Sequence, residues 1–418
     1  MEAAVEKKSG IKELLTYKKC VTLLCANVVS RFGDSLDSIA YAWMVYVLTG
    51  SKLLMGTLFA FNFIPNIVFS FFSGVFADIF PKKRTIMISD FGRGAMVSLT
   101  ALLFLTGYLK PWHLFVFTIV NSTFETFSNP ARGALLPMIL PKKLFINAMS
   151  FLSASSSFAE LLGMALAGFI IGVLGISGAI FIDGATFFIS CFLIGTIKLE
   201  EDTGKQEAVT IKTYTKNFTQ GFDFVKKHKF IKVTIFLGAV CNFSLAPFNV
   251  LQPVYVKDIL KTGAEGMSII GIGFTLGMIL GGLLMGQIGQ KFKKSRFIVT
   301  GFIVIGVCYA LLGLPGTVEI PFVKPVYLAG LICLIFGFFI PVASAPAQSY
   351  SMENTPKEML GRVSAFSSML VLCALPLGSF LTGVVSEYVS IPVLFAAMGC
   401  LTAVTALVLF TDKEFRSI

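Results

Sequence analysis

The stretch VTLLCANVVSRFGDSLDSIAYAWMVYVL, from Val21 to Leu48, is apolar along most of its length but carries Arg31, Asp34 and Asp37 near its middle. A helix rises about 1.5 Å per residue, so about 20 residues cross a bilayer and these charges would lie in the hydrocarbon core. Lipid cannot solvate them. We therefore expect the charged side of this helix to face other protein or water.

The composition of the whole chain indicates a polytopic membrane protein. Of its 418 residues, 55% are hydrophobic and only 14% are charged, and the mean hydropathy is +0.82. These values exclude an ordinary soluble domain. Apolar runs of about 20 residues recur between polar breaks, which favours α-helical spans over the strands of a barrel. The eight cysteines are scattered singly, so no disulfide framework is predicted.

We predict an all-α membrane protein with twelve transmembrane helices. The predicted spans are residues 21–48, 53–79, 84–108, 112–138, 144–173, 178–197, 231–256, 266–290, 296–314, 325–351, 358–387 and 392–411. Residues 198–230 are polar and charged, and we expect them to link an N-terminal six-helix half, residues 1–197, to a C-terminal half, residues 231–418. The part of this linker from Thr210 to Lys229 is either solvated or an amphipathic helix on the inner membrane surface.

The placement of the basic residues predicts the topology. Of the 34 Lys and Arg, 27 fall in or near the N-terminal segment, alternate connections and C-terminus, 5 in the remaining connections, and the last 2, Arg31 and Arg93, within spans. By the positive-inside rule this imbalance places both termini in the cytoplasm of a multi-pass protein of the cytoplasmic membrane. The formal charge of +11 therefore marks topology, and no nucleic-acid partner is predicted.

An internal repeat supports two related halves. GVFADIFPKKR, residues 74–84, aligns with GQIGQKFKKSR, residues 286–296, and four identical pairs share an offset of 212. Parallel repeats of six helices are a known transporter plan, with the binding site between the halves near the membrane midplane.

These features resemble the major facilitator superfamily, and within it the bacterial drug efflux branch that includes macrolide and siderophore exporters. The resemblance rests on RFGDSLDSIAYAWMVYVLTGS (31–51), on GVFADIFPKKR followed by SDFGR (89–93), on NPARGALLP (129–137), and on LGRVSAFSSM (360–369) with PLGSFLTG (376–383). It covers nearly the whole chain and implies a fold of two six-helix halves.

The resemblance also implies an inner gate. In the proteins that this chain resembles, the loop aspartate contacts the start of the eleventh helix and helps to close the inner side, so Asp78 would face the region of Gly361 and Arg362. Asp90 and Arg93, three residues apart, fit a local pair that supports the same gate. The alternative is that these charges only fix topology and solubility. The gating residues expected on these grounds are Gly74, Asp78, Lys82, Lys83, Arg84, Asp90, Arg93 and Arg362.

A cluster of charged residues in the first half is the candidate substrate and proton site. Its expected members are Arg31, Asp34, Asp37, Glu125 and Glu160. Exposed to lipid they would cost on the order of 10 kcal/mol, so we expect them around a hydrated cavity. Carboxylates there can bind protons, with Asp34 and Glu125 as the first candidates; alternatively, Arg31 only pairs with Asp34 or Glu160 to hold helices together. Asp183 is expected at the rim or as a cap.

We therefore predict a secondary active transporter, not an enzyme, that exports amphipathic or cationic small molecules in exchange for protons by alternating access. The expected partners are a small-molecule substrate, protons and membrane lipids, and a monomer is expected. The alternative is transport of a divalent metal ion or a lipid-like substrate on the same fold, with carboxylate oxygens as possible ligands for the ion. No cofactor and no resident metal are predicted, because the two histidines are isolated and no phosphate-binding loop is present.

Overall fold

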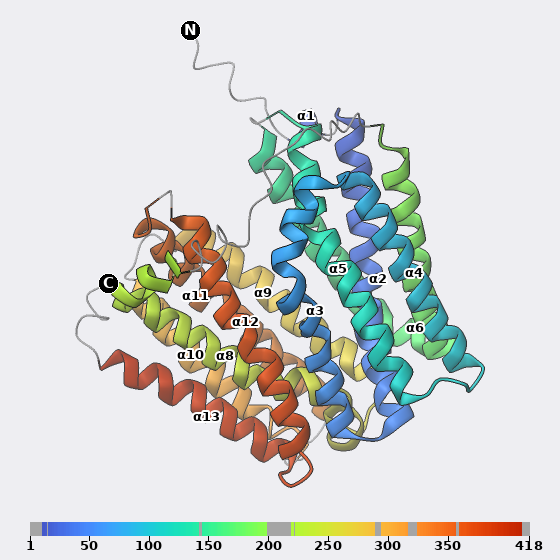
Figure 1. The fold of residues 1–418 in the computed structure, drawn as a ribbon. Coiled ribbons are helices and arrows are strands. Elements are labelled where there is room, and N and C mark those ends of the chain that lie inside the picture. The colour runs from blue at the N-terminus through green and yellow to red at the C-terminus, as the bar shows by residue number, and fades with distance from the viewer. Residues whose placement is uncertain are drawn as a thin grey trace. The chain divides into compact units, whose positions relative to one another are not determined.

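The computed structural model describes residues 11–14, 16–141, 144–198, 219–220, 222–288, 294–316, 324–356 and 359–411, and for some residues inside helices it describes the backbone alone. Every regular element in these ranges is a helix (Figure 1). Most of the predicted linker, including the start of its possible amphipathic helix, lies outside the described residues.

The first group of helices is α1 (Ile11–Leu14), α2 (Lys18–Thr49), α3 (Lys52–Ile79), α4 (Lys82–Leu105), α5 (Pro111–Ile139) and α6 (Phe145–Thr196). The second group is α8 (Lys229–Val254), which continues into the π-helical turn η3 (Tyr255–Ile259), then α9 (Ala264–Ile288), α10 (Lys294–Leu311), α11 (Pro325–Glu353), α12 (Leu360–Val385) and α13 (Ile391–Phe410). Residues typical of helix ends and helix starts agree with these bounds. Gly50 and Gly107 adopt positive φ just after α2 and α4, and prolines begin α5 and α11.

Helix α6 is two spans joined at a kink. Its 52 residues would extend about 78 Å if straight, far more than a bilayer requires. Gly175 breaks it with φ 73° and ψ 175°, a conformation that a residue with a Cβ rarely adopts. Counting α6 as two, the described residues contain the twelve spans that the sequence predicts.

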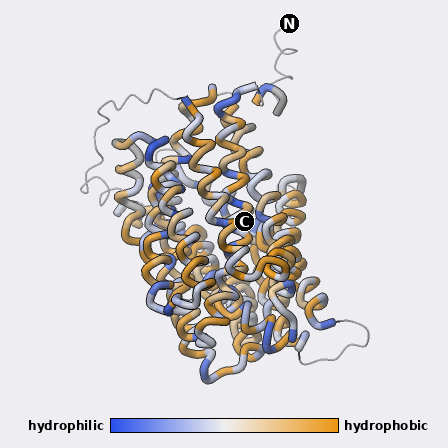
Figure 2. Tube along the Cα trace, turned by 90° about the vertical axis from the view of Figure 1, so that its right-hand side faces the viewer, coloured by the Kyte–Doolittle hydropathy of each residue, from blue (hydrophilic) through white to orange (hydrophobic). Residues whose placement is uncertain are grey.

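Hydropathy and exposure support a membrane environment. Nine helices of the described residues are long and apolar enough to cross a membrane. Helices α2 and α5 fall short of that measure because both carry charged and amide side chains within their length. Figure 2 shows hydrophobic residues along most of the helical tube. Large apolar side chains such as Phe169 and Phe192 are about 70% exposed, which suits contact with lipid acyl chains.

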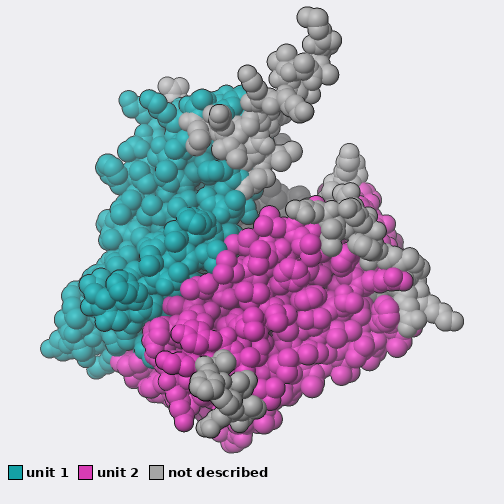
Figure 3. Space-filling model, turned by 180° about the vertical axis from the view of Figure 1, so that it is seen from behind, with its two compact units in different colours: residues 1–44, 61–208 teal, residues 45–60, 209–418 magenta. Residues whose placement is uncertain are grey.

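Two compact units divide the chain (Figure 3). Unit 1 comprises residues 1–44 and 61–208, and unit 2 comprises residues 45–60 and 209–418. The end of α2 and the start of α3 therefore group with unit 2. There the Tyr46 hydroxyl donates a hydrogen bond to the Asp258 carboxylate at 2.9 Å, and Lys52 Nζ donates to the Ser386 carbonyl at 3.0 Å.

Glycines allow close helix packing in unit 2. A Cβ on Gly277 of α9 would lie 2.1 Å from the Leu334 carbonyl of α11, and one on Gly281 would lie 2.0 Å from the Phe338 carbonyl. The glycines of α9, the eighth predicted span, thus allow close packing at these two positions, whereas Gly282 and Gly286 face open space.

Candidate functional site

An ion pair joins α4 to α2, the helix that carries Arg31, Asp34 and Asp37. Arg93 Nη2 of α4 donates to Asp34 Oδ1 of α2 at 2.8 Å, and both side chains are mostly buried. Arg93 Nε donates to Asn121 Oδ1 of α5 at 3.2 Å, and the guanidinium lies 4.2 Å from the centre of the Phe187 ring of α6. Arg93 thus connects four helices of unit 1, and the charged stripe predicted on α2 does face other protein.

A glycine brings α6 against that stripe. A Cβ on Gly33 would lie 2.0 Å from Thr186 Oγ1 and 2.3 Å from Asp183 Oδ1, so only glycine fits there. Asp183 is 1% exposed and accepts a hydrogen bond from Thr186. The expectation of a rim or capping residue is wrong, because the second part of α6 packs Asp183 against the middle of α2. Its charge interacts with those of Asp34, Asp37 and Arg93.

A second buried ion pair involves α4 about one turn earlier, at Asp90. Arg132 Nη2 of α5 donates to both oxygens of Asp90, at 2.5 and 2.6 Å, and Ser190 of α6 donates to Asp90 Oδ2 at 2.7 Å. Asp90 is fully buried. The expected pair of Asp90 with Arg93 does not form; each residue binds a partner on a neighbouring helix. Sequence spacing shows only which residues share a helix face, and it cannot show which face the next helix presents.

Asp37 lies one turn beyond Gly33 on α2. Its Oδ1 atom is buried and has no hydrogen-bond partner among the described residues. Its charge interacts with Asp34 and Arg93, and Tyr41, one turn further on, shares a hydrogen bond of 2.8 Å with Thr118 of α5. A buried carboxylate oxygen without a hydrogen-bond donor is costly, so this position needs a proton, water or another donor.

A pocket of about 230 Å³ lies within unit 1. Its lining combines charged, neutral polar and apolar side chains: Leu23, Asn27, Ser30, Arg31, Asp34, Arg93, Glu125, Ser128, Asn129, Arg132, Gly133, Leu136, Met149 and Leu152. Three of the five predicted site residues, Arg31, Asp34 and Glu125, line it. The other two are not in the lining: Asp37 lies three residues beyond Asp34 on α2, and Glu160 is exposed on α6.

The charges of this region are more numerous than the sequence indicates. Four acids against one arginine were expected, but the structure gathers six acids and three arginines in unit 1. The acids are Asp34, Asp37, Asp90, Glu125, Glu160 and Asp183, and the arginines are Arg31, Arg93 and Arg132. Four of the acids form no ion pair within the described residues: Asp37, Glu125, Glu160 and Asp183.

The fold and this charged site can be compared with known proteins. The sequence profile of the Major Facilitator Superfamily matches residues 23–373 and 247–417, which together span most of the chain. The chain belongs to the Major Facilitator Superfamily. Its members are membrane transporters rather than enzymes, so this protein is a multi-pass secondary transporter.

Relatives within the superfamily include drug exporters. Macrolide efflux protein A of Streptococcus pyogenes is 22% identical over 401 residues, which cover 96% of this chain and 97% of that protein. Multidrug efflux pump Tap of Mycolicibacterium fortuitum is 23% identical over 385 residues, covering 90% of this chain and 91% of the pump.

Solved structures of the superfamily share the fold at low sequence identity. The nucleoside transporter NupG has a TM-score of 0.74 at 13% identity, with 94% of this chain and 98% of that chain covered. The xylose transporter XylE from E. coli, in an inward open conformation, has a TM-score of 0.67 at 15% identity, with 93% and 95% covered. These structures support the fold alone.

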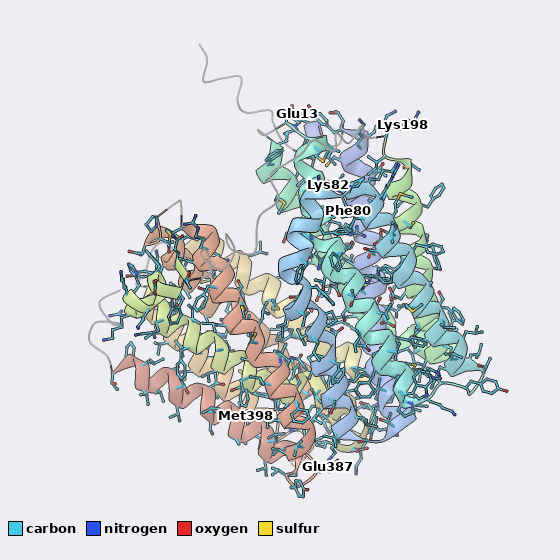
Figure 4. All side chains as sticks on the ribbon, viewed as in Figure 1. Glu13, Phe80, Lys82, Lys198, Glu387 and Met398 are labelled. Atoms are coloured by element: carbon cyan, nitrogen blue, oxygen red, sulfur yellow. The ribbon has the colours of Figure 1, made fainter. Side chains whose placement is uncertain are left out.

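Three of the expected gating residues, Lys82, Lys83 and Arg84, lie at the start of α4. Lys83 Nζ donates to the carbonyls of Gly195 and Ile197, at 2.7 and 2.8 Å, where α6 ends. Figure 4 shows Lys82 and Phe80 at the turn from α3 to α4, and Arg84 beside them is exposed. Lys83 therefore supplies donors for the last carbonyls of α6, besides any part in a gate.

The expected Asp78 latch lies outside what the structure describes, because only the backbone is given at Gly74, Asp78 and Gly361. Arg362 is described, and its Nη1 donates to Gln220 Oε1 at 2.6 Å within unit 2. Gating by these residues stays a prediction.

The described residues do not favour a metal substrate. No group of three His, Cys, Asp or Glu side chains in this part of the chain lies close enough to hold a metal ion. Two carboxylates of unit 1, Asp34 and Asp90, pair with arginines instead. The divalent-metal alternative therefore has no support from these side chains.

Proposed function

We propose that the protein exports amphipathic small molecules, cations among them, in exchange for protons, with both termini in the cytoplasm. The observation that carries this proposal is the excess of carboxylates over arginines among the charged residues that unit 1 gathers, six acids against three arginines. The names of the relatives, a macrolide efflux protein and a multidrug efflux pump, support the substrate class.

The excess of carboxylates supplies the means of coupling. Each ionised side chain at the centre of a membrane helix costs about 2.5–3.5 kcal/mol, so the four acids without an ion pair would together cost on the order of 10 kcal/mol. That equals the whole stability of a typical folded protein. Protonation removes this cost, and a proton that is held only in one conformation links its own movement to that of the substrate.

Glu125 is the proposed coupling acid. It lines the pocket, it is half-buried, and its charge interacts with Arg93, which is already paired with Asp34. Asp34 is already engaged in an ion pair with Arg93 and is not proposed as the coupling acid. Asp37, Glu160 and Asp183 lie outside the pocket lining and are proposed as secondary proton sites.

The experiment that tests this proposal compares two modes of transport in proteoliposomes with erythromycin and ethidium as probes. An imposed gradient of one pH unit supplies about 1.4 kcal/mol per proton, enough for about tenfold accumulation of a substrate exchanged for one proton. We expect Glu125→Gln to abolish accumulation driven by the gradient but to retain exchange of labelled for unlabelled substrate without a gradient.

The matched control is Glu387→Gln, because Glu387 is an exposed acid in the turn between α12 and α13 (Figure 4). It should accumulate substrate like the unmodified protein. Gradient-driven accumulation that survives Glu125→Gln would refute the coupling role of Glu125. Absence of transport of both probes by the unmodified protein would refute the proposed substrate class.

A further inference from the structure

Three guanidinium groups meet in the pocket of unit 1, against two carboxylates in the same lining. Arg31 comes from α2, Arg93 from α4 and Arg132 from α5, whereas the acids are Asp34 and Glu125. The pocket surface itself is therefore more basic than its surroundings, because Asp90, Asp37 and Asp183 are not part of its lining.

Two of the three arginines already have carboxylate partners. Arg93 is paired with Asp34 at 2.8 Å, and Arg132 is paired with both oxygens of Asp90. Arg31 differs from them. It is exposed to the pocket and forms no hydrogen bond or ion pair with any residue that the structure describes.

Glu160 of α6 is an opposing charge close enough to interact with Arg31. The two charges interact, but no ion-pair contact joins them. Arg132 also retains donor capacity, since its buried Nη1 atom has no acceptor among the described residues. A guanidinium at this depth in a membrane protein requires water or an anion, because lipid and apolar side chains cannot accept its hydrogen bonds.

The shape of the lining indicates what kind of molecule supplies that anion. Leu23 lies eight residues before Arg31 on α2, about 12 Å along the helix axis. Leu23, Leu136, Met149 and Leu152 provide apolar lining, whereas Arg31, Ser30 and Asn129 provide hydrogen-bonding groups. A ligand with an apolar body and one acidic group fits this distribution.

We propose that Arg31 binds the acidic group of the substrate, a carboxylate or an equivalent oxyanion, so that the transported amphiphiles include organic acids and zwitterions. The inference deepens the proposed function, on which it rests by taking the pocket of unit 1 as the substrate site. Glu160 balances the charge of Arg31 when the pocket is empty, and it competes with the acidic group of the substrate for Arg31.

The test uses three indole probes that differ in one group: indole-3-acetate, indole-3-acetamide and tryptamine. Their dissociation constants are measured with the full-length protein in nanodiscs, by thermal shift at several ligand concentrations. A charge-assisted hydrogen bond to Arg31 should make the carboxylate bind about tenfold more tightly than the neutral amide. Arg31→Gln should abolish this preference, and Glu160→Gln should increase it.

Matched variants make the outcome specific. Arg296→Gln removes an exposed arginine of unit 2 and should leave the preference unchanged. Arg31→Lys keeps the charge without the planar fork and should give an intermediate preference, which also shows that position 31 tolerates substitution. Retained binding of the amide by Arg31→Gln shows that the pocket is still formed.

Equal affinity for acid and amide, including binding of neither, would overturn the proposal, as would a preference that survives Arg31→Gln. These results are independent of the export assay. If proton-driven export fails but the protein still prefers indole-3-acetate to the amide, only the proposed coupling and direction are refuted. If the protein exports erythromycin but does not prefer the acid, only the role of Arg31 is refuted.

Discussion

Disruption of the Asp90–Arg132 ion pair should be among the most destabilising single changes in unit 1. Asp90 is fully buried and accepts three hydrogen bonds of 2.5–2.7 Å, two from Arg132 and one from Ser190. Removal of one member of a buried pair costs about 3–5 kcal/mol, because the other is left as an uncompensated buried charge. We expect that loss for Asp90→Asn and for Arg132→Gln.

The assay is a double-mutant cycle in mixed micelles, with SDS-induced unfolding followed by helical circular dichroism. If the pair is as described, Asp90→Asn and Arg132→Gln together should cost much less than the sum of the single changes, with a coupling energy of about 3 kcal/mol. The matched cycle combines Asp90→Asn with Arg93→Gln. Its coupling should be below about 1 kcal/mol, because Arg93 binds Asp34 instead.

The comparison of the two cycles separates the tertiary arrangement from the local one. The reasoning is refuted if Asp90 couples more strongly to Arg93 than to Arg132, since that is the result expected from a pair three residues apart on one helix. Additive effects in both cycles would equally refute it, because they would mean that neither pair contributes a specific interaction.

Two further changes test the packing around the site. Gly33→Ala should lower stability by about 1–3 kcal/mol, because its methyl group would overlap the Thr186 hydroxyl, 2.0 Å away; thermal melting measures this, with Gly282→Ala, which faces open space, as the control. Lys83→Gln should cost about 1 kcal/mol or more by loss of two hydrogen bonds to the end of α6, measured in the same way against Lys198→Gln.

The opposite results would be informative. If the Gly33 and Gly282 variants change the melting temperature equally, α2 and α6 are not in close contact at Gly33. A Lys83 variant as stable as the unmodified protein would show that water satisfies the last carbonyls of α6 equally well.

Much of the fold was predictable because local physics fixes it. The length of each apolar segment, set by bilayer thickness, yields the twelve spans. Helical periodicity places Asn27, Arg31 and Asp34 on one side of α2, and all three line the pocket. Glycines also recur along α9, and Gly277 and Gly281 among them lie against α11.

The partners of the charged residues were not predictable in the same way. A spacing of three residues allowed Asp90 and Arg93 to pair. Instead, α5 presents Arg132 to Asp90, and α2 presents Asp34 to Arg93. Which of two compatible pairs forms depends on the rotation of whole helices, and that rotation is set by packing far along the chain.

The sequence by itself determined that charges lie within the membrane-spanning part of the first half and that they must avoid lipid, because their depth follows from helix rise and their cost from desolvation. Only the tertiary structure decided that Asp183 packs against these charges, in the space left by Gly33. It also decided that Arg31 lines the pocket without an ion-pair partner among the described residues. The physical reason is that depth is a property of one helix, whereas pairing requires the relative rotation of several.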